Sequence, residues 1–169
     1  MATKSATLTL ENDHLRFGVR TGSGHTIAID SGPHGAGPSP AELVPIALAG
    51  CTAMDVISIL RKKRQPVTSY RIHVAGHQRE EPSPAIFMSA EVTHEVHGDV
   101  DPSAIARAIE LSAEKYCSVG GTLASGITAI VHRYRLVRPD GSVEEATVVT
   151  EGPYERREEL LAARGATSA

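Results

Sequence analysis

An apolar run from Leu43 to Leu60 is the feature that most constrains how this chain of 169 residues can fold. Ser39, Pro40 and Glu42 stand directly before it, and their spacing predicts a capping box with proline at the first helical position. The residues that follow are apolar on almost every face of a helix. A helix of that kind is buried on all sides, so we expect a central helix wrapped by other elements.

Segments that alternate between apolar and polar residues lie on both sides of this run. Six of them are predicted strands, at 6–10, 14–21, 25–31, 69–78, 85–98 and 127–137. A second, amphipathic helix is predicted over 103–117, with Asp101 and Pro102 as its cap and first residue. The order β-β-β-α-β-β-α-β predicts an α+β fold, with antiparallel sheets around a buried central helix.

All of these elements fall within residues 1–138, which we interpret as a single domain. The length of the chain suits one well-packed domain better than two. Residues 139–169 follow a turn signal at 138–142 and are interpreted as an appended C-terminal extension. The last part of the extension is rich in charged residues and helix formers, which favours a short surface helix or a frayed tail.

The net charge of the chain argues against some classes of binding partner, and its hydropathy bears on its location in the cell. The formal charge of −3 argues against broad electrostatic capture of nucleic acid or of an anionic membrane. No export signal is visible at the N-terminus, and the most apolar stretch, 43–54, is too short to span a bilayer. We therefore expect a cytoplasmic protein. In that reducing compartment a transient, catalytic disulfide is more plausible than a permanent structural one.

The two cysteines are the candidate reactive groups. Cys51 lies within the central helix and Cys117 at the end of the second helix. The residue types leave two interpretations of Cys51 open, because a free cysteine is either a small core residue or a nucleophile. Cysteines on two helices separated by a hairpin can meet when the helices pack together.

Two stretches around these cysteines resemble the OsmC/Ohr family of osmotically induced and organic hydroperoxide resistance proteins. They are SPAELVPIALAGCTAMDVISILRKKR (39–64) and KYCSVGGTLASGI (115–127), and the hairpin RTGSGHTIAID (20–30) accompanies them. The resemblance covers residues 14–137. The charged ILRKKR after the first cysteine is more similar to the broad OsmC-like subgroup than to the Ohr branch.

The resemblance implies an OsmC-like fold and thiol peroxidase chemistry without a cofactor or metal. Cys51 would be the peroxidatic cysteine, which attacks an organic hydroperoxide or hydrogen peroxide and becomes a sulfenic acid. Cys117 would be the resolving cysteine, which forms a Cys51–Cys117 disulfide that an external dithiol reduces. The family also implies an intertwined homodimer with active sites at the subunit interface.

Family members activate the thiol with an arginine from the N-terminal strands, held by a glutamate at the start of the central helix. Arg16 and Arg20 both fall in the right region, and Arg20, beside the glycine-rich turn, is preferred. The family glutamate directly follows the proline, where this chain has Ala41. Glu42 either replaces that glutamate or only completes the capping box.

Two other functions remain open at this stage. One is a non-catalytic protein of the same fold that binds a small apolar ligand at the dimer interface. The other is a thiol redox or metal sensor that uses the two cysteines and a histidine. The histidines of the predicted strands show no metal-binding spacing and are expected to be solvated or core residues: His73, His77, His94, His97 and His132. Asp55 lies on the same helical face as Cys51 and is expected to pair elsewhere.

Overall fold

The computed structural model describes residues 3–11, 15–31, 35, 37–126 and 128–152. The chain forms two compact units that divide between Val44 and Pro45. In the first unit, strands β1 (Ala6–Leu10), β2 (Phe17–Thr21) and β3 (Thr26–Ile29) form an antiparallel sheet in sequence order. Gly24, with φ of +89°, makes the turn between β2 and β3. The predicted three-stranded meander is confirmed.

Helix α1 spans Leu43–Lys62, so it begins three residues after Pro40, which was expected at the first helical position, and residues 40–42 form a turn instead. Glu42 Oε2 accepts hydrogen bonds from the Ser39 N–H and hydroxyl, both at 2.7 Å. The Glu42 N–H donates in return to Ser39 Oγ at 3.4 Å. This reciprocal pair is the predicted capping box, and it supplies partners at a helix end that would otherwise lack them.

The expectation that α1 is buried on all sides is wrong for the single chain. Its buried residues follow one stripe at helical spacing: Leu48, Ala49, Thr52, Val56 and Leu60. Apolar side chains elsewhere on the helix are exposed, including Ile46 at 53% and Met54 at 72%. One sheet covers only one face of a helix, and the apolar side chains on the rest of α1 have no cover among the described residues.

The second unit is built on a sheet in the order β4 (Val67–Gln78), β5 (Phe87–Gly98), β6 (Ala129–Val137), β7 (Val143–Glu151). Strands β4 and β5 form the predicted antiparallel hairpin. One pairing differs from the expected antiparallel sheets, because β5 and β6 run parallel. Parallel neighbours require a long crossover, and the helical segment between these two strands supplies it.

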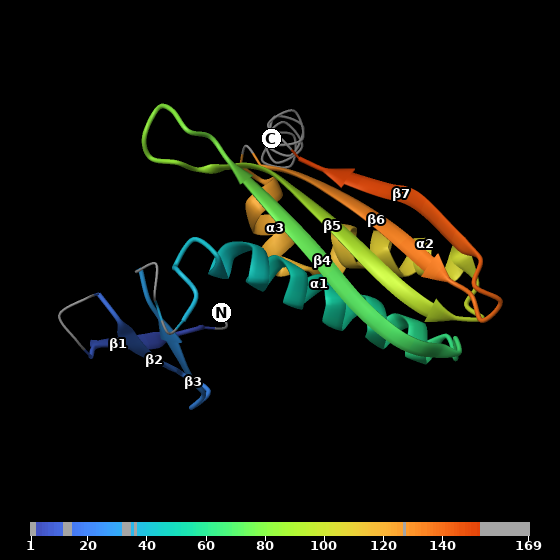
Figure 1. Cartoon of the computed structure of the whole chain (residues 1–169), viewed down its shortest axis with the longest axis horizontal. Helices are drawn as coiled ribbons and strands as arrows, with labels where there is room; N and C mark the ends of the chain where they lie inside the picture. Colours follow the sequence, from blue (N-terminus) through green and yellow to red (C-terminus); the bar gives the residue numbers. More distant parts are fainter. Residues whose placement is uncertain (1–2, 12–14, 32–34, 36, 127, 153–169) are drawn as a thin grey trace, which may run out of the picture. The chain divides into compact units, whose positions relative to one another are not determined.

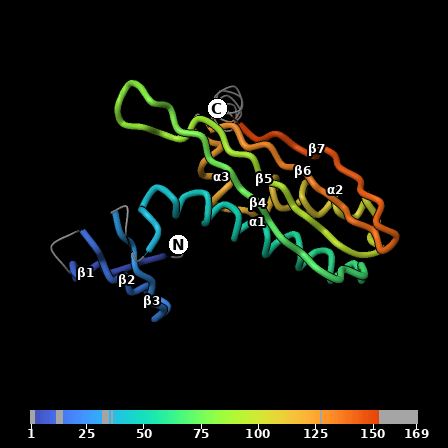
Figure 2. Tube along the Cα trace, in the orientation of Figure 1, coloured from blue at the N-terminus to red at the C-terminus, as the bar shows by residue number. Residues whose placement is uncertain are grey.

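That crossover is more divided than the single helix predicted over 103–117. It consists of α2 (Pro102–Leu111), a π-helical turn η1 (Ser112–Tyr116) and α3 (Ser118–Ala124). The predicted cap is confirmed, since Asp101 Oδ1 accepts from the Ser103 N–H at 2.8 Å. Figures 1 and 2 show α1, α2 and α3 along the same face of the four-stranded sheet.

Strand β7 was not expected from the sequence. Val143–Glu151 pairs antiparallel with β6, so this part of the segment interpreted as an extension belongs to the sheet. The pairing with β6 skips Val148, and all but one residue of β7 are exposed or half-buried, so the alternation by which strands are recognised is weak. The expected helix or tail after residue 152 lies outside the described residues.

Helix α1 also changes one argument about membranes. With 20 residues it is longer than the apolar stretch 43–54, which alone is too short to span a bilayer. By length and composition α1 could cross a membrane, although a core helix of a soluble protein satisfies the same criteria. The cytoplasmic location therefore stays a prediction.

The helix-covered face of the sheet carries two buried histidines among its apolar side chains. His94 on β5 and His132 on β6 are stacked, with ring centroids 6.0 Å apart. The Tyr70 hydroxyl lies 2.6 Å from His94 Nδ1. Burial, and secondarily the neighbouring His132, lowers the pKa of His94 to about 3. His94 is therefore neutral in the folded protein.

This burial predicts a loss of stability in mild acid. The unfolded chain binds a proton at His94 near pH 6.5 whereas the folded chain does not, so the stabilisation present above pH 6.5 is lost as pH falls toward 3. Urea unfolding at pH 7 and pH 5 should show His94 contributing about 2 kcal/mol to the decrease. His94→Gln should remove that contribution, and exposed His77→Gln should not. Equal pH dependence in all three proteins would contradict the assignment.

Candidate thiol site

Cys51 and Cys117 come together in the second unit. Both belong to a cluster on the helix-covered face of the sheet, in which Cys117 is buried and Cys51 half-buried. Both are free cysteines, and Cys51 lies close enough to contribute to the raised pKa of the Cys117 thiol. The predicted meeting of these two residues is therefore present in the structure, although their chemical roles stay predictions.

The chain around Cys117 holds its thiol in place. The Cys117 N–H donates to the Ser112 carbonyl at 2.8 Å and closes the π-turn η1. Cys117 itself is extended, with ψ of 94°, and is the N-cap residue of α3. In that position its sulfur accepts a hydrogen bond from the Gly120 N–H at 3.2 Å. π-helical turns of this kind are frequent at functional sites.

The surroundings of Cys117 favour its protonated form. Burial, with smaller contributions from the neighbouring Cys51 and Asp55, raises the pKa of the Cys117 thiol to about 12, although the hydrogen bond from the Gly120 N–H opposes this shift. Only the thiolate is a good nucleophile. Any reaction in which Cys117 attacks another group therefore requires a way to remove its proton.

Asp55 pairs away from Cys51, as the sequence analysis expected. The Ser112 hydroxyl donates to Asp55 Oδ2 at 3.0 Å, and Ser112 Oγ lies equally close to Thr52 Oγ1. These contacts join α1 to η1 directly beside the thiols. The hydrogen bonds therefore fix the register of the helix that carries Cys51 against the turn that carries Cys117.

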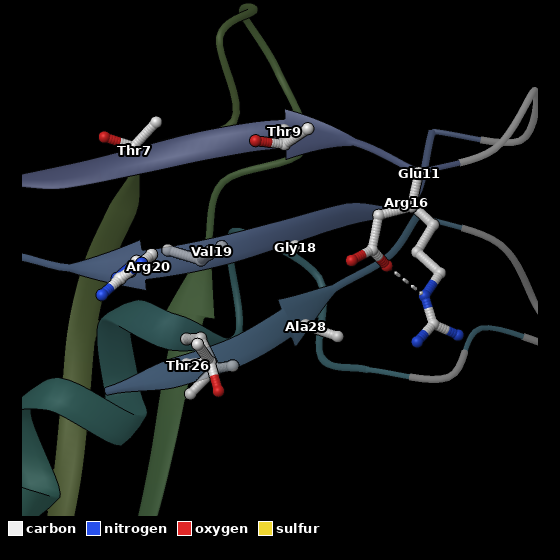
Figure 3. A pocket seen from close by; sticks show the side chains of 10 residues that line it. Thr7, Thr9, Glu11, Arg16, Gly18, Val19, Arg20, Thr26 and Ala28 are labelled. Carbon is white, nitrogen blue, oxygen red and sulfur yellow. Dashed lines mark hydrogen bonds and ion pairs between the residues drawn. The ribbon is translucent and has the colours of Figure 1, made fainter. Parts of the chain in front are cut away.

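The two candidate arginines lie in the first unit and differ in their partners. They line a hollow of about 600 Å³ on the sheet of β1, β2 and β3 (Figure 3). Arg16 Nε donates to Glu11 Oε2 at 2.9 Å. Arg20 is exposed at the other end of the hollow, and no ion pair to it is found within the described part of the chain. The role of either arginine beside a thiolate stays a prediction.

Glu42 also belongs to the first unit, where its carboxylate is engaged in the capping box. The Ser39 N–H, followed by the Ser39 hydroxyl, holds the pKa of Glu42 below its usual value. The carboxylate is therefore ionised at neutral pH. Its capping role is confirmed, whereas its predicted role beside an arginine stays a prediction.

Sequence reasoning missed a buried polar group on the same face of the sheet. Glu151 on β7 is 2% exposed, and its Oε2 lies 3.6 Å from Nε2 of buried His132. His132 was expected to be a solvated or core histidine, and it is a core residue. Glu151 gave no sequence signal, because its strand was not predicted. Among the described residues no group of three His, Cys, Asp or Glu side chains could hold a metal ion.

Comparison with known proteins places the chain in a family. The profile described as OsmC-like protein matches residues 32–132. The chain belongs to the OsmC-like family. Protein YhfA from Escherichia coli K12 is 41% identical over 124 residues, which are 73% of this chain and 91% of YhfA. Membership indicates a redox or peroxide-related function.

Solved structures support the same fold. A hypothetical protein from Aquifex aeolicus is 31% identical, with a TM-score of 0.70 over 82% of this chain and 98% of its own. An organic hydroperoxide resistance protein OsmC from Legionella pneumophila is 14% identical, with a TM-score of 0.55 over 78% of this chain and 96% of its own. At that identity the likeness shows the fold alone. The OsmC-like fold expected from the sequence is confirmed.

The thiol contact makes a prediction that does not depend on peroxide chemistry. Because the two cysteines pack in the same cluster, mild oxidation with diamide should join Cys51 and Cys117 within one chain. Mass spectrometry of a non-reduced digest should contain the cross-linked peptide, and Cys117→Ser should lack it. Disulfides found only between chains would contradict the observed placement.

Proposed function

We propose that this OsmC-like protein is a thiol-dependent peroxidase that reduces organic hydroperoxides or hydrogen peroxide. The observation that carries the proposal is the packing of two free cysteines in one cluster, one half-buried and one buried. A half-buried thiol can meet a substrate from solvent, and a buried partner in contact with it can trap the oxidised product. The hydroperoxide resistance named for the Legionella pneumophila structure is consistent with this chemistry.

In the proposed reaction the Cys51 thiolate attacks the O–O bond of the hydroperoxide. An alcohol or water leaves, and Cys51 becomes a sulfenic acid. Cys117 then attacks the sulfenic sulfur, water is released and the Cys51–Cys117 disulfide forms. An external dithiol reduces the disulfide and restores both thiols. No cofactor or metal takes part in these steps.

The proposal gives Arg20 the role of activating cation. A nearby guanidinium stabilises a thiolate and so raises the fraction of Cys51 able to react at neutral pH. Arg20 is preferred to Arg16 because Arg16 is already paired with Glu11. Glu42 would hold Arg20 while it also caps α1. The capping box keeps the Glu42 carboxylate charged, which suits that second role.

Serine variants of the two cysteines should fail in different ways. Cys51→Ser should not react with cumene hydroperoxide, because a neutral hydroxyl cannot attack the O–O bond. Cys117→Ser should consume about one equivalent and then stop, with Cys51 trapped as a sulfenic acid open to over-oxidation. Stopped-flow peroxide consumption and mass spectrometry measure both outcomes. Turnover by Cys51→Ser at the wild-type rate would refute the proposal.

The roles of the two arginines can be separated by a matched pair of variants. Arg20→Ala should slow the reaction of Cys51 with peroxide by about tenfold or more, because the thiolate loses the cation that stabilises it. Arg16→Ala should have a smaller effect, since it removes a cation that Glu11 already neutralises. The opposite ranking would assign activation to Arg16.

We also propose that the protein is a homodimer. The apolar surface of α1 that this chain leaves exposed, with Met54 at its centre, needs cover in water. Sedimentation at micromolar concentration should give about twice the chain mass. Met54→Lys should lower that mass or the solubility, whereas Val143→Lys, at an exposed position on β7, should do neither. A well-folded wild-type monomer would contradict the proposal.

A further inference from the structure

Three buried polar side chains lie on the face of the sheet that also receives Cys117. They are His94 on β5, His132 on β6 and Glu151 on β7. Glu151 pairs in register with Ile130, which belongs to the same cluster as Cys117. The polar group therefore lies beside the thiol site and not at a distant point of the core.

The buried ends of Glu151 and His132 have no hydrogen-bond partner within the described residues. Glu151 Oε2 and both ring nitrogens of His132 are in this state, and the closest approach is 3.6 Å between Glu151 Oε2 and His132 Nε2. Burying a carboxylate without partners costs free energy that an apolar residue would avoid. A buried polar pair of this kind calls for a chemical explanation.

Gly120 brings Glu151 and Cys117 to the same point. A Cβ on Gly120 would lie 3.1 Å from Glu151 Oε2 and 3.3 Å from Cys117 Sγ. The carboxylate oxygen and the sulfur therefore both border the small space that a side chain at residue 120 would fill. The Gly120 N–H approaches the same sulfur to 3.2 Å.

We propose that Glu151 accepts the proton that Cys117 loses when it forms the disulfide, an inference that rests on the proposed resolving role of Cys117. The proton passes from Cys117 Sγ to the Glu151 carboxylate directly or through one water, as general bases do. His132 is the positioning residue, since its Nε2 lies against the oxygen that receives the proton.

The step balances without a further reactant. The Cys117 sulfur forms a bond to the Cys51 sulfenic sulfur, and the S–O bond of the sulfenic acid breaks. The Cys117 sulfur is oxidised and the Cys51 sulfur is reduced, while the departing hydroxide takes a proton from solvent and becomes water. Glu151 later returns its proton to solvent. The hydroperoxide of the first step is the only oxidant consumed.

Asp55 on α1 is the other candidate base. Its charge contributes to the raised pKa of Cys117, but its Oδ2 already accepts a hydrogen bond from the Ser112 hydroxyl. The other titratable groups around the site are Cys51 on α1, His132 on β6, and His94 on β5 with Tyr70 on β4. His94 is neutral in the folded protein, and burial raises the pKa of Tyr70, so neither takes a proton from a thiol near neutral pH.

A disulfide reagent tests the proposal without peroxide. 4,4′-Dithiodipyridine should react first with the more exposed Cys51 and release one pyridinethione. Cys117 then attacks the mixed disulfide and releases the second, so the second phase reports deprotonation and attack by Cys117. Glu151→Gln should retain the first phase and slow the second by about a hundredfold, within the usual range for a general base. Glu145→Gln, at an exposed position of the same strand, should change neither phase.

The pH dependence separates a base from a structural support. In Glu151→Gln the second phase should increase about tenfold per pH unit, because only hydroxide remains to deprotonate Cys117. The wild-type second phase should depend less steeply on pH, because its base is a carboxylate and not hydroxide. A merely structural role of Glu151 would lower the rate and leave this slope unchanged, and that outcome would overturn the proposal.

Two glycine variants test the space between Glu151 and Cys117 while both of these residues are retained. Gly120→Ala should slow the second phase, since its Cβ would enter the space between Glu151 and Cys117. Gly121→Ala is the matched control, because a Cβ there meets nothing within 4 Å. This pair also tests the proposal should Glu151→Gln fail to fold. Equal second phases in both alanine variants would contradict it.

Two further outcomes distinguish the proposed role of Glu151 from the proposed peroxidase function. A protein that does not react with peroxide, yet shows the expected second phase and its loss in Glu151→Gln, would refute the peroxidase function and retain the role of Glu151. An Asp55→Asn variant that alone acquires the steep pH dependence would assign the proton to Asp55. That result would overturn the role of Glu151 and leave the peroxidase proposal intact.

Discussion

The site depends on the contact between the Cys51 and Cys117 thiols, which two packing arrangements create. The buried stripe of α1 lies on the same sheet face as the crossover helices, so the middle of α1 faces the end of η1. Hydrogen bonds from Ser112 then fix the register of the two elements. If α1 rotated by one residue, Thr52 would lose its buried position and Cys51 would turn away from its partner.

The different surroundings of the two cysteines explain why they would have different chemical roles. Cys51 is half-buried, so reagents from solvent can reach it. Cys117 is buried with its pKa raised, so it reacts only when a base removes its proton. A resolving thiol that is unreactive until the first thiol is oxidised suits a two-step peroxidase. The carboxylate of Glu151 is the proposed means of releasing it.

Much of this architecture could be predicted from the sequence because its signals are local. The capping box at Ser39 and Glu42, the alternating strands and the cap at Asp101 all depend on residues close together in the chain. The parallel pairing of β5 and β6 and the burial of Glu151 depend on partners far apart in the sequence. Strand β7 has a weak alternation, so neither it nor the polar group it completes was visible. The sequence analysis expected α1 to be buried on all sides. Hydropathy shows that an apolar surface needs cover, but it does not show whether the same chain or a second one provides it.

The most direct test of the account is a count of thiols after reaction with peroxide in the absence of a dithiol. Reduced protein is mixed with one equivalent of cumene hydroperoxide per chain, quenched in acid, denatured and alkylated. The account predicts that each chain loses both thiols and that one cumyl alcohol forms for every pair lost. Intact hydroperoxide beside two unreacted thiols per chain would contradict it, and Cys51 would then be a core residue.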